Sequence, residues 1–136
     1  MSRRTARETA LQVLFQIDIT GEADNRNEII ENWAAEFAVS EKSLKFAREL
    51  VDGTLLRKDE IDDKLALTAH EWALDRMNTV DRNLMRLAIF EMSFCRETPQ
   101  KVILNEAIEI AKRFGGEDSA RFINGILDKL MDNAEK

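Results

Sequence analysis

The sequence contains too little of several residue types to support some classes of protein. A single cysteine, Cys95, excludes an internal disulfide framework, and a single histidine, His70, leaves no histidine pair for a zinc site. One proline and five glycines are few for a chain built from turns or disorder. No apolar run reaches the roughly 18 residues of a membrane span, and residues 1–4 lead into polar positions rather than a signal-peptide core. We therefore expect a soluble, cytoplasmic protein without a metal or cofactor.

The residue types that are abundant favour amphipathic helices. Hydrophobic residues make up 44% and charged residues 34% of the 136 positions, a balance typical of helices with one buried and one solvated face. No repeat, low-complexity tract or flexible linker divides the chain. The sequence therefore predicts an all-α protein in which residues 1–136 form a single domain.

The negative charge is concentrated in the middle of the chain. The formal net charge is −6, and residues 21–71 alone hold thirteen acidic and seven basic side chains. An acidic middle can face water or a basic partner, while the two ends form a separate, more basic surface. The alternative is that the arginines near the N-terminus are a solvated, frayed end.

Apolar residues at helical spacing cover most of the N-terminal half. The predicted helices cover about residues 2–20, 27–37 and 40–65, and the candidate N-caps are Ser2 or Thr5 for the first and Ser40 for the third. Gly21 is expected to end the first helix. Gly53 is a weak point in the third pattern, which fits one long helix or two.

The same spacing continues toward the C-terminus around a strongly apolar segment. Residues 80–94 predict a central core helix, and residues 68–78 before it fit a short helix or a turn. The candidate starts are Asn78 or Thr79 for residues 80–94, and Thr98 as cap with Pro99 as first helical residue for the next helix.

The run from Phe114 onward predicts a rigid junction between two helices. Gly115 or Gly116 can take the positive φ that closes a helix, and Asp118 or Ser119 can supply the oxygen that caps the next one. Gly125, inside the apolar stripe that follows, indicates a close contact between helices.

The sequence contains no residue pattern typical of a catalytic site. His70 and Cys95 could form a pair only through folding, and the carboxylate pairs sit on charged faces where solvation explains them. The Gly115-Gly116 pair lacks the strand and the lysine of a phosphate-binding loop. We expect a protein that is not an enzyme, with no catalytic and no metal-binding residues.

The remaining candidates are groups that bind RNA. Arg3, Arg4 and Arg7 lie at the entrance of the first helix, and Arg3 and Arg7 share a face. Arg121 and Phe122 lie at the entrance of the last helix, near Lys112 and Arg113. Guanidinium groups bind phosphates and an exposed ring can stack on a base. Gln12 could read a base edge if it lies beside the arginines. Phe122 could instead belong to the core, because it begins the apolar stripe.

Four segments of the chain resemble the NusB family of bacterial transcription antitermination factors. They are residues 3–15, 80–91, 105–109 and 114–129. The resemblance implies an all-α fold of about seven helices in two packed bundles, without enzymatic activity. It implies binding to single-stranded RNA of the boxA type in ribosomal RNA leaders, together with NusE, the small-subunit ribosomal protein, within the RNA polymerase antitermination complex.

The resemblance also implies a set of site residues. The RNA-binding positions in this sequence are Arg3, Arg4, Arg7, Gln12, Arg76, Asp118, Arg121 and Phe122. Ala69 is a departure, since relatives can carry an aromatic residue there. The partner surface is expected on the acidic middle and on the polar side of residues 80–94, with Asp81, Leu84 and Glu91, because a basic ribosomal protein is attracted to acidic groups.

Two other interpretations stay open. A similar helical domain is fused to ribosomal RNA methyltransferases, although this chain ends at residue 136 without a methyltransferase portion. From a different class, the chain could be a helical adaptor or a homodimer that acts through protein contacts alone.

Overall fold

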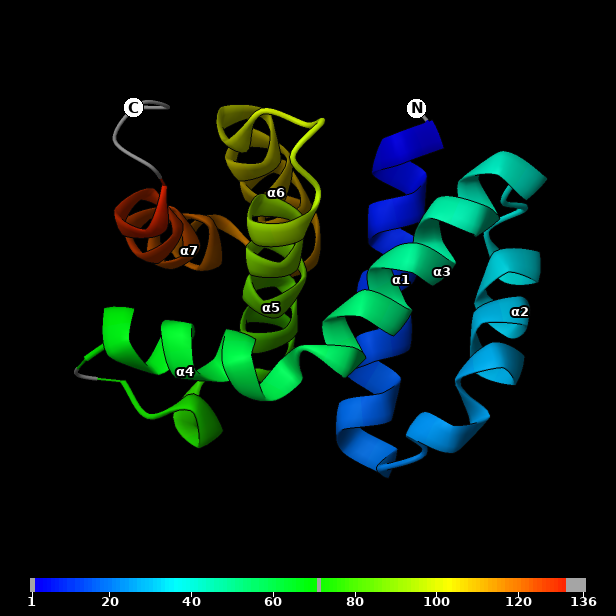
Figure 1. Ribbon diagram of the computed structural model, residues 1–136, viewed down its shortest axis with the longest axis horizontal. Helices are drawn as coiled ribbons and strands as arrows, with labels where there is room; N and C mark the ends of the chain where they lie inside the picture. Colours follow the sequence, from blue (N-terminus) through cyan, green and yellow to red (C-terminus); the bar gives the residue numbers. More distant parts are fainter. Residues whose placement is uncertain (1, 71, 132–136) are drawn as a thin grey trace. The chain divides into compact units, whose positions relative to one another are not determined.

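The computed structural model describes residues 2–70 and 72–131, and in these residues it has seven α-helices, two 3₁₀ helices and no strand (Figure 1). The helices form two compact units, Met1–Leu56 (unit 1) and Arg57–Lys136 (unit 2). The expected all-α fold of about seven helices in two bundles is confirmed. The expectation that the two units behave as a single domain stays a prediction, and each unit is described by itself.

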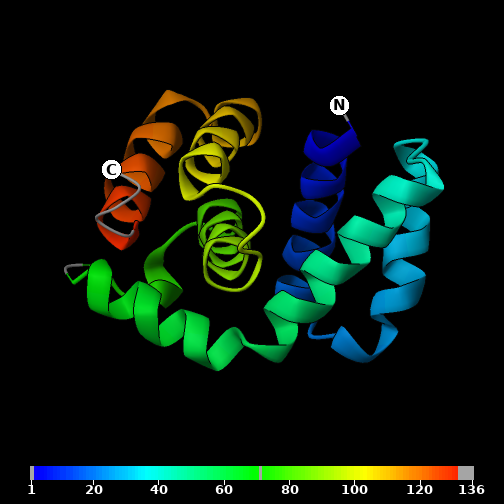
Figure 2. The same cartoon turned by 45° about the horizontal axis from the view of Figure 1, so that its top comes forward.

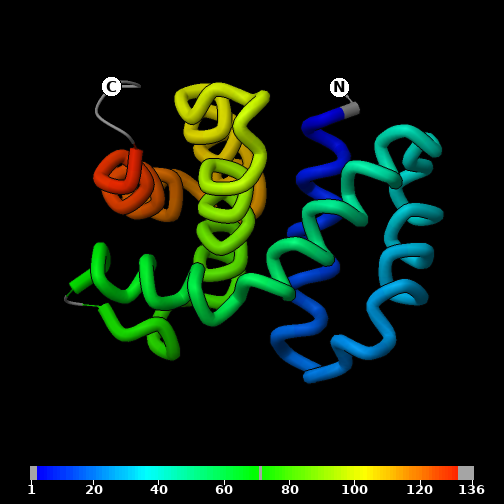
Figure 3. The backbone as a smooth tube through the Cα atoms, in the orientation of Figure 1, coloured from blue at the N-terminus to red at the C-terminus, as the bar shows by residue number. Residues whose placement is uncertain are grey.

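Unit 1 is built on the first helix. Its elements are α1 (Ser2–Thr20), the 3₁₀ helix η1 (Ala23–Asn25), α2 (Arg26–Glu36) and α3 (Glu41–Leu56). Helix α1 packs against both α2 and α3, as the tube in Figure 3 shows. The small side chains Ala6 and Ala10 are fully buried, which lets α1 lie close to its neighbours. Burial of one face of each helix therefore forms this unit's core.

The boundaries of the first helix follow from its sequence in part. Gly21 ends α1 as expected, with φ of +76° and its N–H donating to the Ile17 carbonyl at 2.7 Å. Thr5 as N-cap is wrong, because α1 already begins at Ser2 and Thr5 lies inside it, accepting through its carbonyl from the Thr9 hydroxyl. The Ser2 side chain, the other candidate cap, lies outside the described part.

Two helices, not one, follow Ser40. The Ser40 hydroxyl accepts from the Ser43 N–H at 3.2 Å, which confirms it as the cap. Gly53 lies inside α3, and the break comes at Arg57, before α4 (Lys58–Thr68). The expectation that Gly53 is the weak point is therefore wrong. The buried face of α3 continues through Thr54, so packing holds the helix intact across the glycine.

Unit 2 surrounds a central helix. It contains α4, the 3₁₀ helix η2 (Leu74–Arg76), α5 (Thr79–Phe94), α6 (Gln100–Phe114) and α7 (Glu117–Leu130). Helix α5 packs on α4, α6 and α7, and α6 packs along α7. Figure 2 shows α5 enclosed by these neighbours. The prediction of a central core helix at residues 80–94 is confirmed for this unit.

The helix starts in unit 2 show which caps the sequence could predict. The Asn78 side chain accepts from the Asp81 N–H at 2.8 Å and caps α5, as expected. Pro99 precedes α6 rather than forming its first residue, and Thr98 makes no cap, so that start is displaced by one position. Within the ambiguous stretch, Leu74–Arg76 form the short helix η2.

An ion pair ties α4 to α5 within unit 2. The guanidinium of Arg86 donates to both oxygens of Asp62, from Nε to Oδ1 at 2.8 Å and from Nη2 to Oδ2 at 3.0 Å. Its Nη1 donates to Asn83. Arg86 is buried and Asp62 is partly exposed, so the pair is a fixed element of the packing. None of the described helices is both long and apolar enough to cross a membrane.

Candidate nucleic-acid interface

The arginines at the entrance of α1 are arranged around one aromatic ring of α3. The Arg3 guanidinium carbon lies 3.9 Å from the centroid of Phe46, and that of Arg7 lies 5.6 Å from it. The predicted shared face of Arg3 and Arg7 is therefore confirmed. Arg3 is exposed, Arg4 is half-buried and Arg7 is 5% exposed. Of the three, Arg3 is the most exposed, while Arg7 is buried beside the Phe46 ring.

Gln12 lies on a different side of α1 from this cluster. A helix turns by about 100° per residue, so nine residues place Gln12 roughly opposite Arg3. Its side chain is half-buried. The condition under which Gln12 was expected to read a base, a position beside the arginines, is not met for Arg3 and Arg7.

The junction between α6 and α7 depends on two glycines with different tasks. Gly116 has φ of +95° and is the N-cap residue of α7, and both Gly115 and Gly116 donate to the Ala111 carbonyl. A Cβ on Gly115 would lie 2.4 Å from Ser119 Oγ, so this position has no room for a side chain. The tight junction predicted from the glycine pair is confirmed, and Gly116 takes the positive φ.

Asp118 and Ser119 do not cap α7, contrary to expectation. Helix α7 begins at Glu117, so both residues lie inside its first turn. Asp118 is exposed and accepts a hydrogen bond from Arg121, one turn later. Ser119 is buried instead. The first turn of α7 therefore presents a neutralised acid–base pair to solvent.

The residues expected to bind the partner are buried. Asp81 is 6%, Leu84 1% and Glu91 1% exposed. Burial raises the pKa of the Asp81 carboxyl, an effect that the Ser119 and Asn78 side chains partly offset. These three side chains offer little accessible surface, and the partner surface on this helix stays a prediction. Their burial follows from the packing of α5 against α4, α6 and α7.

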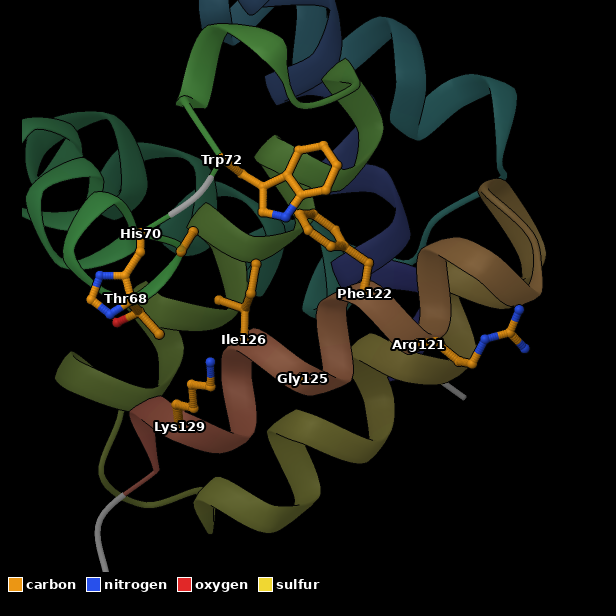
Figure 4. A pocket seen from close by; sticks show the side chains of 9 residues that line it. Thr68, His70, Trp72, Arg121, Phe122, Gly125, Ile126 and Lys129 are labelled. Carbon is orange, nitrogen blue, oxygen red and sulfur yellow. The ribbon is translucent and has the colours of Figure 1, made fainter.

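A cavity of about 390 Å³ opens beside the α7 entrance in unit 2. Figure 4 shows Trp72 and Phe122 side by side at one part of it, with Ile126 and Lys129 further along α7. The two rings meet edge to face, with centroids 5.6 Å apart and planes at 75°. Phe122 is half-buried, and Trp72 is 55% exposed. Phe122 is therefore both part of the packing and part of the cavity wall.

Other candidates fall inside and outside this cavity. Arg121 and His70 border it, and Ala69 is buried in its wall. Arg76 is exposed at the end of η2 and does not line it. Sequence reasoning missed Trp72 and Lys129, because Trp72 lies in an irregular segment whose neighbours periodicity cannot predict. The one feature of the sequence that could have indicated Trp72 is that it is a large aromatic residue outside the apolar positions of the predicted helices.

Comparison with known proteins decides the family. The model of the NusB family matches residues 4–132. The chain belongs to the NusB family. It is 55% identical, over its full length and 92% of the relative, to the transcription antitermination protein NusB of Desulfitobacterium hafniense strain DSM 10664 / DCB-2. It is 45% identical to NusB of Bacillus cereus strain B4264, over 97% of this chain and 98% of the relative.

Solved NusB structures share the fold. T. maritima NusB matches with a TM-score of 0.88 at 36% identity, over 98% of this chain and 93% of that one. NusB in a complex of antitermination factors NusB and NusE with double-stranded RNA matches with a TM-score of 0.85 at 27% identity, over 95% of each chain. The segments that resembled NusB in the sequence therefore belong to a NusB fold.

Proposed function

We propose that this chain is an RNA-binding transcription antitermination factor that works in the cytoplasm without catalysing a reaction. Its RNA is a single strand of the boxA type in ribosomal RNA leaders, and it is bound together with NusE as part of the RNA polymerase antitermination complex. The observation that carries the proposal is the aromatic and cationic group at the α7 entrance, where Phe122 and Trp72 border a cavity beside Arg121.

The chemistry of this group suits unpaired RNA. Single strands offer both faces of their bases, so aromatic rings add affinity by stacking while cations hold the phosphates. In unit 1, Arg3 adds an exposed guanidinium whose position is fixed over Phe46. The chain as a whole has a net charge of −6, so its overall charge does not attract nucleic acid. Affinity for RNA would have to come from these local positive groups.

The relatives support the same function. The curated relatives are transcription antitermination proteins, and a structural neighbour is seen with NusE and RNA. The match to that neighbour extends over 95% of both chains, which supports a similar binding fold. Asp81, Leu84 and Glu91 are buried, so the proposed partner surface would have to include exposed residues beside them.

The proposal is tested by titrating the protein with short boxA-type RNA, with and without NusE, at several salt concentrations. A scrambled RNA of equal length is the control. We expect preference for boxA-type RNA and tighter binding when NusE is present. Binding of NusE without any binding of RNA would contradict the proposal and favour a protein-only adaptor. Self-association that competes with RNA would favour the homodimer.

A further inference from the structure

Gly125 has no structural reason to be a glycine. It lies in the middle of α7 and is exposed, and a Cβ built on it would meet no atom within 4 Å. The expected close contact between helices at this position is therefore absent from the described residues. Glycine destabilises a helix interior relative to alanine, so neither packing nor helix propensity explains its presence. Gly125 lines the cavity, and because it has no side chain it leaves the bare helix backbone as the floor of that cavity.

Trp72 forms an exposed wall above that floor. Its backbone N–H donates to the Ala69 carbonyl at 2.7 Å, which fixes the turn that carries it. An edge-to-face pair uses an edge of one ring and a single face of the other, so at least one face of the indole stays outside its contact with Phe122. A large indole that is 55% exposed beside a cavity is available for stacking.

Two basic residues of α7 flank the open floor, and one of them, Arg121, is paired with Asp118. Arg121 and Lys129 border the cavity, and each is four residues from Gly125 along α7. Eight residues of helix place their Cα atoms about 12 Å apart along the axis. Figure 4 shows the Trp72 ring, the bare backbone at Gly125 and the Lys129 side chain around the cavity, while the Arg121 side chain points away from it, beyond Phe122. A nucleotide has the matching parts, a flat base between two phosphates.

We propose that this cavity holds one unpaired RNA base, stacked on Trp72 and seated over Gly125, with Lys129 facing the phosphate on one side and Arg121, on release from Asp118, facing the phosphate on the other. The inference rests on the proposed function and adds the residues and the type of ligand at this position. Phe122 acts as a positioning residue, because its edge-to-face contact fixes the orientation of the Trp72 indole. An apolar peptide would offer no anion to Lys129 or Arg121, so a nucleotide fits the cavity better.

Fluorescence tests the stacking directly, because the chain has only two tryptophans. Trp33 lies in unit 1, and Trp33→Phe keeps an aromatic ring beside Phe37. In that variant only Trp72 emits. We expect quenching when boxA-type single-stranded RNA is added, and much weaker quenching with an abasic oligonucleotide of the same length. Equal quenching by both would overturn the stacking, because phosphates alone would then explain the signal.

A substitution that fills the floor tests the same site without loss of stability. Gly125→Leu places a side chain over the cavity, and leucine suits a helix better than glycine. We expect RNA affinity to fall about 5- to 150-fold, the range for losing one stacked base, while the melting temperature stays equal or rises. Asn124→Leu is the matched control, since Asn124 is exposed on the same helix but does not line the cavity.

The outcomes separate this inference from the proposed function. Loss of affinity in Gly125→Leu and in Trp72→Leu, with Asn124→Leu unchanged, supports the base site. Equal affinity of Gly125→Leu, Asn124→Leu and the unaltered protein overturns the site and leaves RNA binding intact. Failure of the unaltered protein to bind RNA at any tested salt would instead remove the proposed function itself.

Discussion

At the scale of single residues, the pair formed by Asp118 and Arg121 bears most directly on the proposed RNA binding. Both side chains are exposed, and Arg121 donates to Asp118 within the first turn of α7. The carboxylate favours the helix dipole, yet it also occupies the guanidinium and repels phosphate. The same acid therefore stabilises the helix slightly and opposes the RNA binding proposed for this turn.

Asp118→Asn is expected to tighten RNA binding. The change removes one negative charge and frees the Arg121 guanidinium, while loss of the exposed pair and of the dipole interaction costs roughly 0.3 to 1 kcal/mol each. Glu117→Gln, which removes an equal charge from the same turn, is the control. RNA titrations and thermal melts on both variants check this. If the two variants bind RNA equally well, the ion pair with Arg121 has no role of its own.

Asp81 is expected to make stability depend on pH. Because burial raises the pKa of its carboxyl in the folded state, the ionised group lowers the free energy of unfolding at pH values above that folded pKa. This loss disappears as the pH falls through the folded pKa toward 3.8, the ordinary pKa of an aspartate. Asp81→Asn should therefore melt at a higher temperature at pH 7, and its advantage should shrink as the pH is lowered.

Calorimetry of Asp81→Asn and the unaltered protein between pH 4 and 8 would check this, within the pH range where both are folded. An advantage that grows toward low pH would show that the ionised carboxyl stabilises the fold, against the direction of the shift. The residue scale also limits what sequence can predict. Nothing in the pattern of residues 78–84 distinguishes a buried Asp81 from a surface acid, because its burial comes from neighbouring elements.

At the scale of elements, the sequence predicted what depends on local chemistry. Helical spacing placed α2 and α5 within one or two residues, and Gly21, Ser40 and Asn78 act where local hydrogen bonding requires them. Predictions failed where packing decides. Gly53 is held inside α3 by its buried face, and Gly125 was read as a helix contact although the space beside it is open.

The candidate site shows the same division. Arg121 and Phe122 could be chosen from sequence, because they follow a predictable junction. Trp72 could not, because it meets Phe122 only after α4, α5, α6 and α7 have packed together. Contacts between residues about fifty positions apart depend on the tertiary arrangement, which no local spacing contains.

The pair of Arg86 and Asp62 is expected to be the main polar tie between α4 and α5. Asp62→Ala leaves the buried guanidinium without its carboxylate and should cost about 3 kcal/mol of unfolding free energy, the lower end for buried pairs since Asp62 is partly exposed. Arg86→Met with Asp62→Ala should recover much of this loss. Urea denaturation of the unaltered protein, the single variant and the double variant measures their free energies of unfolding.

A matched surface pair provides the control for that experiment. Arg26 donates to Asp52 at 2.7 Å in unit 1, with both side chains about half exposed. Asp52→Ala should cost under about 1 kcal/mol, because water screens exposed pairs. Equal losses for Asp62→Ala and Asp52→Ala would mean that burial adds nothing to the tie between α4 and α5.

At the scale of the whole molecule, charge is distributed so that RNA binding must be local. A chain with a net charge of −6 repels nucleic acid on average, so affinity has to come from a few placed cations and from stacking. Most arginines elsewhere serve the fold, as Arg48 does by donating to Asn27 and Glu31. This division allows the cations proposed to bind RNA to be distinguished experimentally from those that hold helices together.

The salt dependence of RNA binding is expected to show whether Arg3 and Arg4 contact phosphates. Each phosphate contact on single-stranded RNA contributes about 0.7 to the slope of log affinity against log salt, so Arg3→Ala with Arg4→Ala should reduce the slope by about 1.4. Arg7 is left in place, because it is buried under the cluster beside Phe46 and its loss would alter packing.

The control is the double variant Arg26→Ala with Arg48→Ala. It removes two charges from the same unit and should leave the slope unchanged. If both double variants lower the slope equally, only the total charge matters, and the α1 entrance is not a phosphate site.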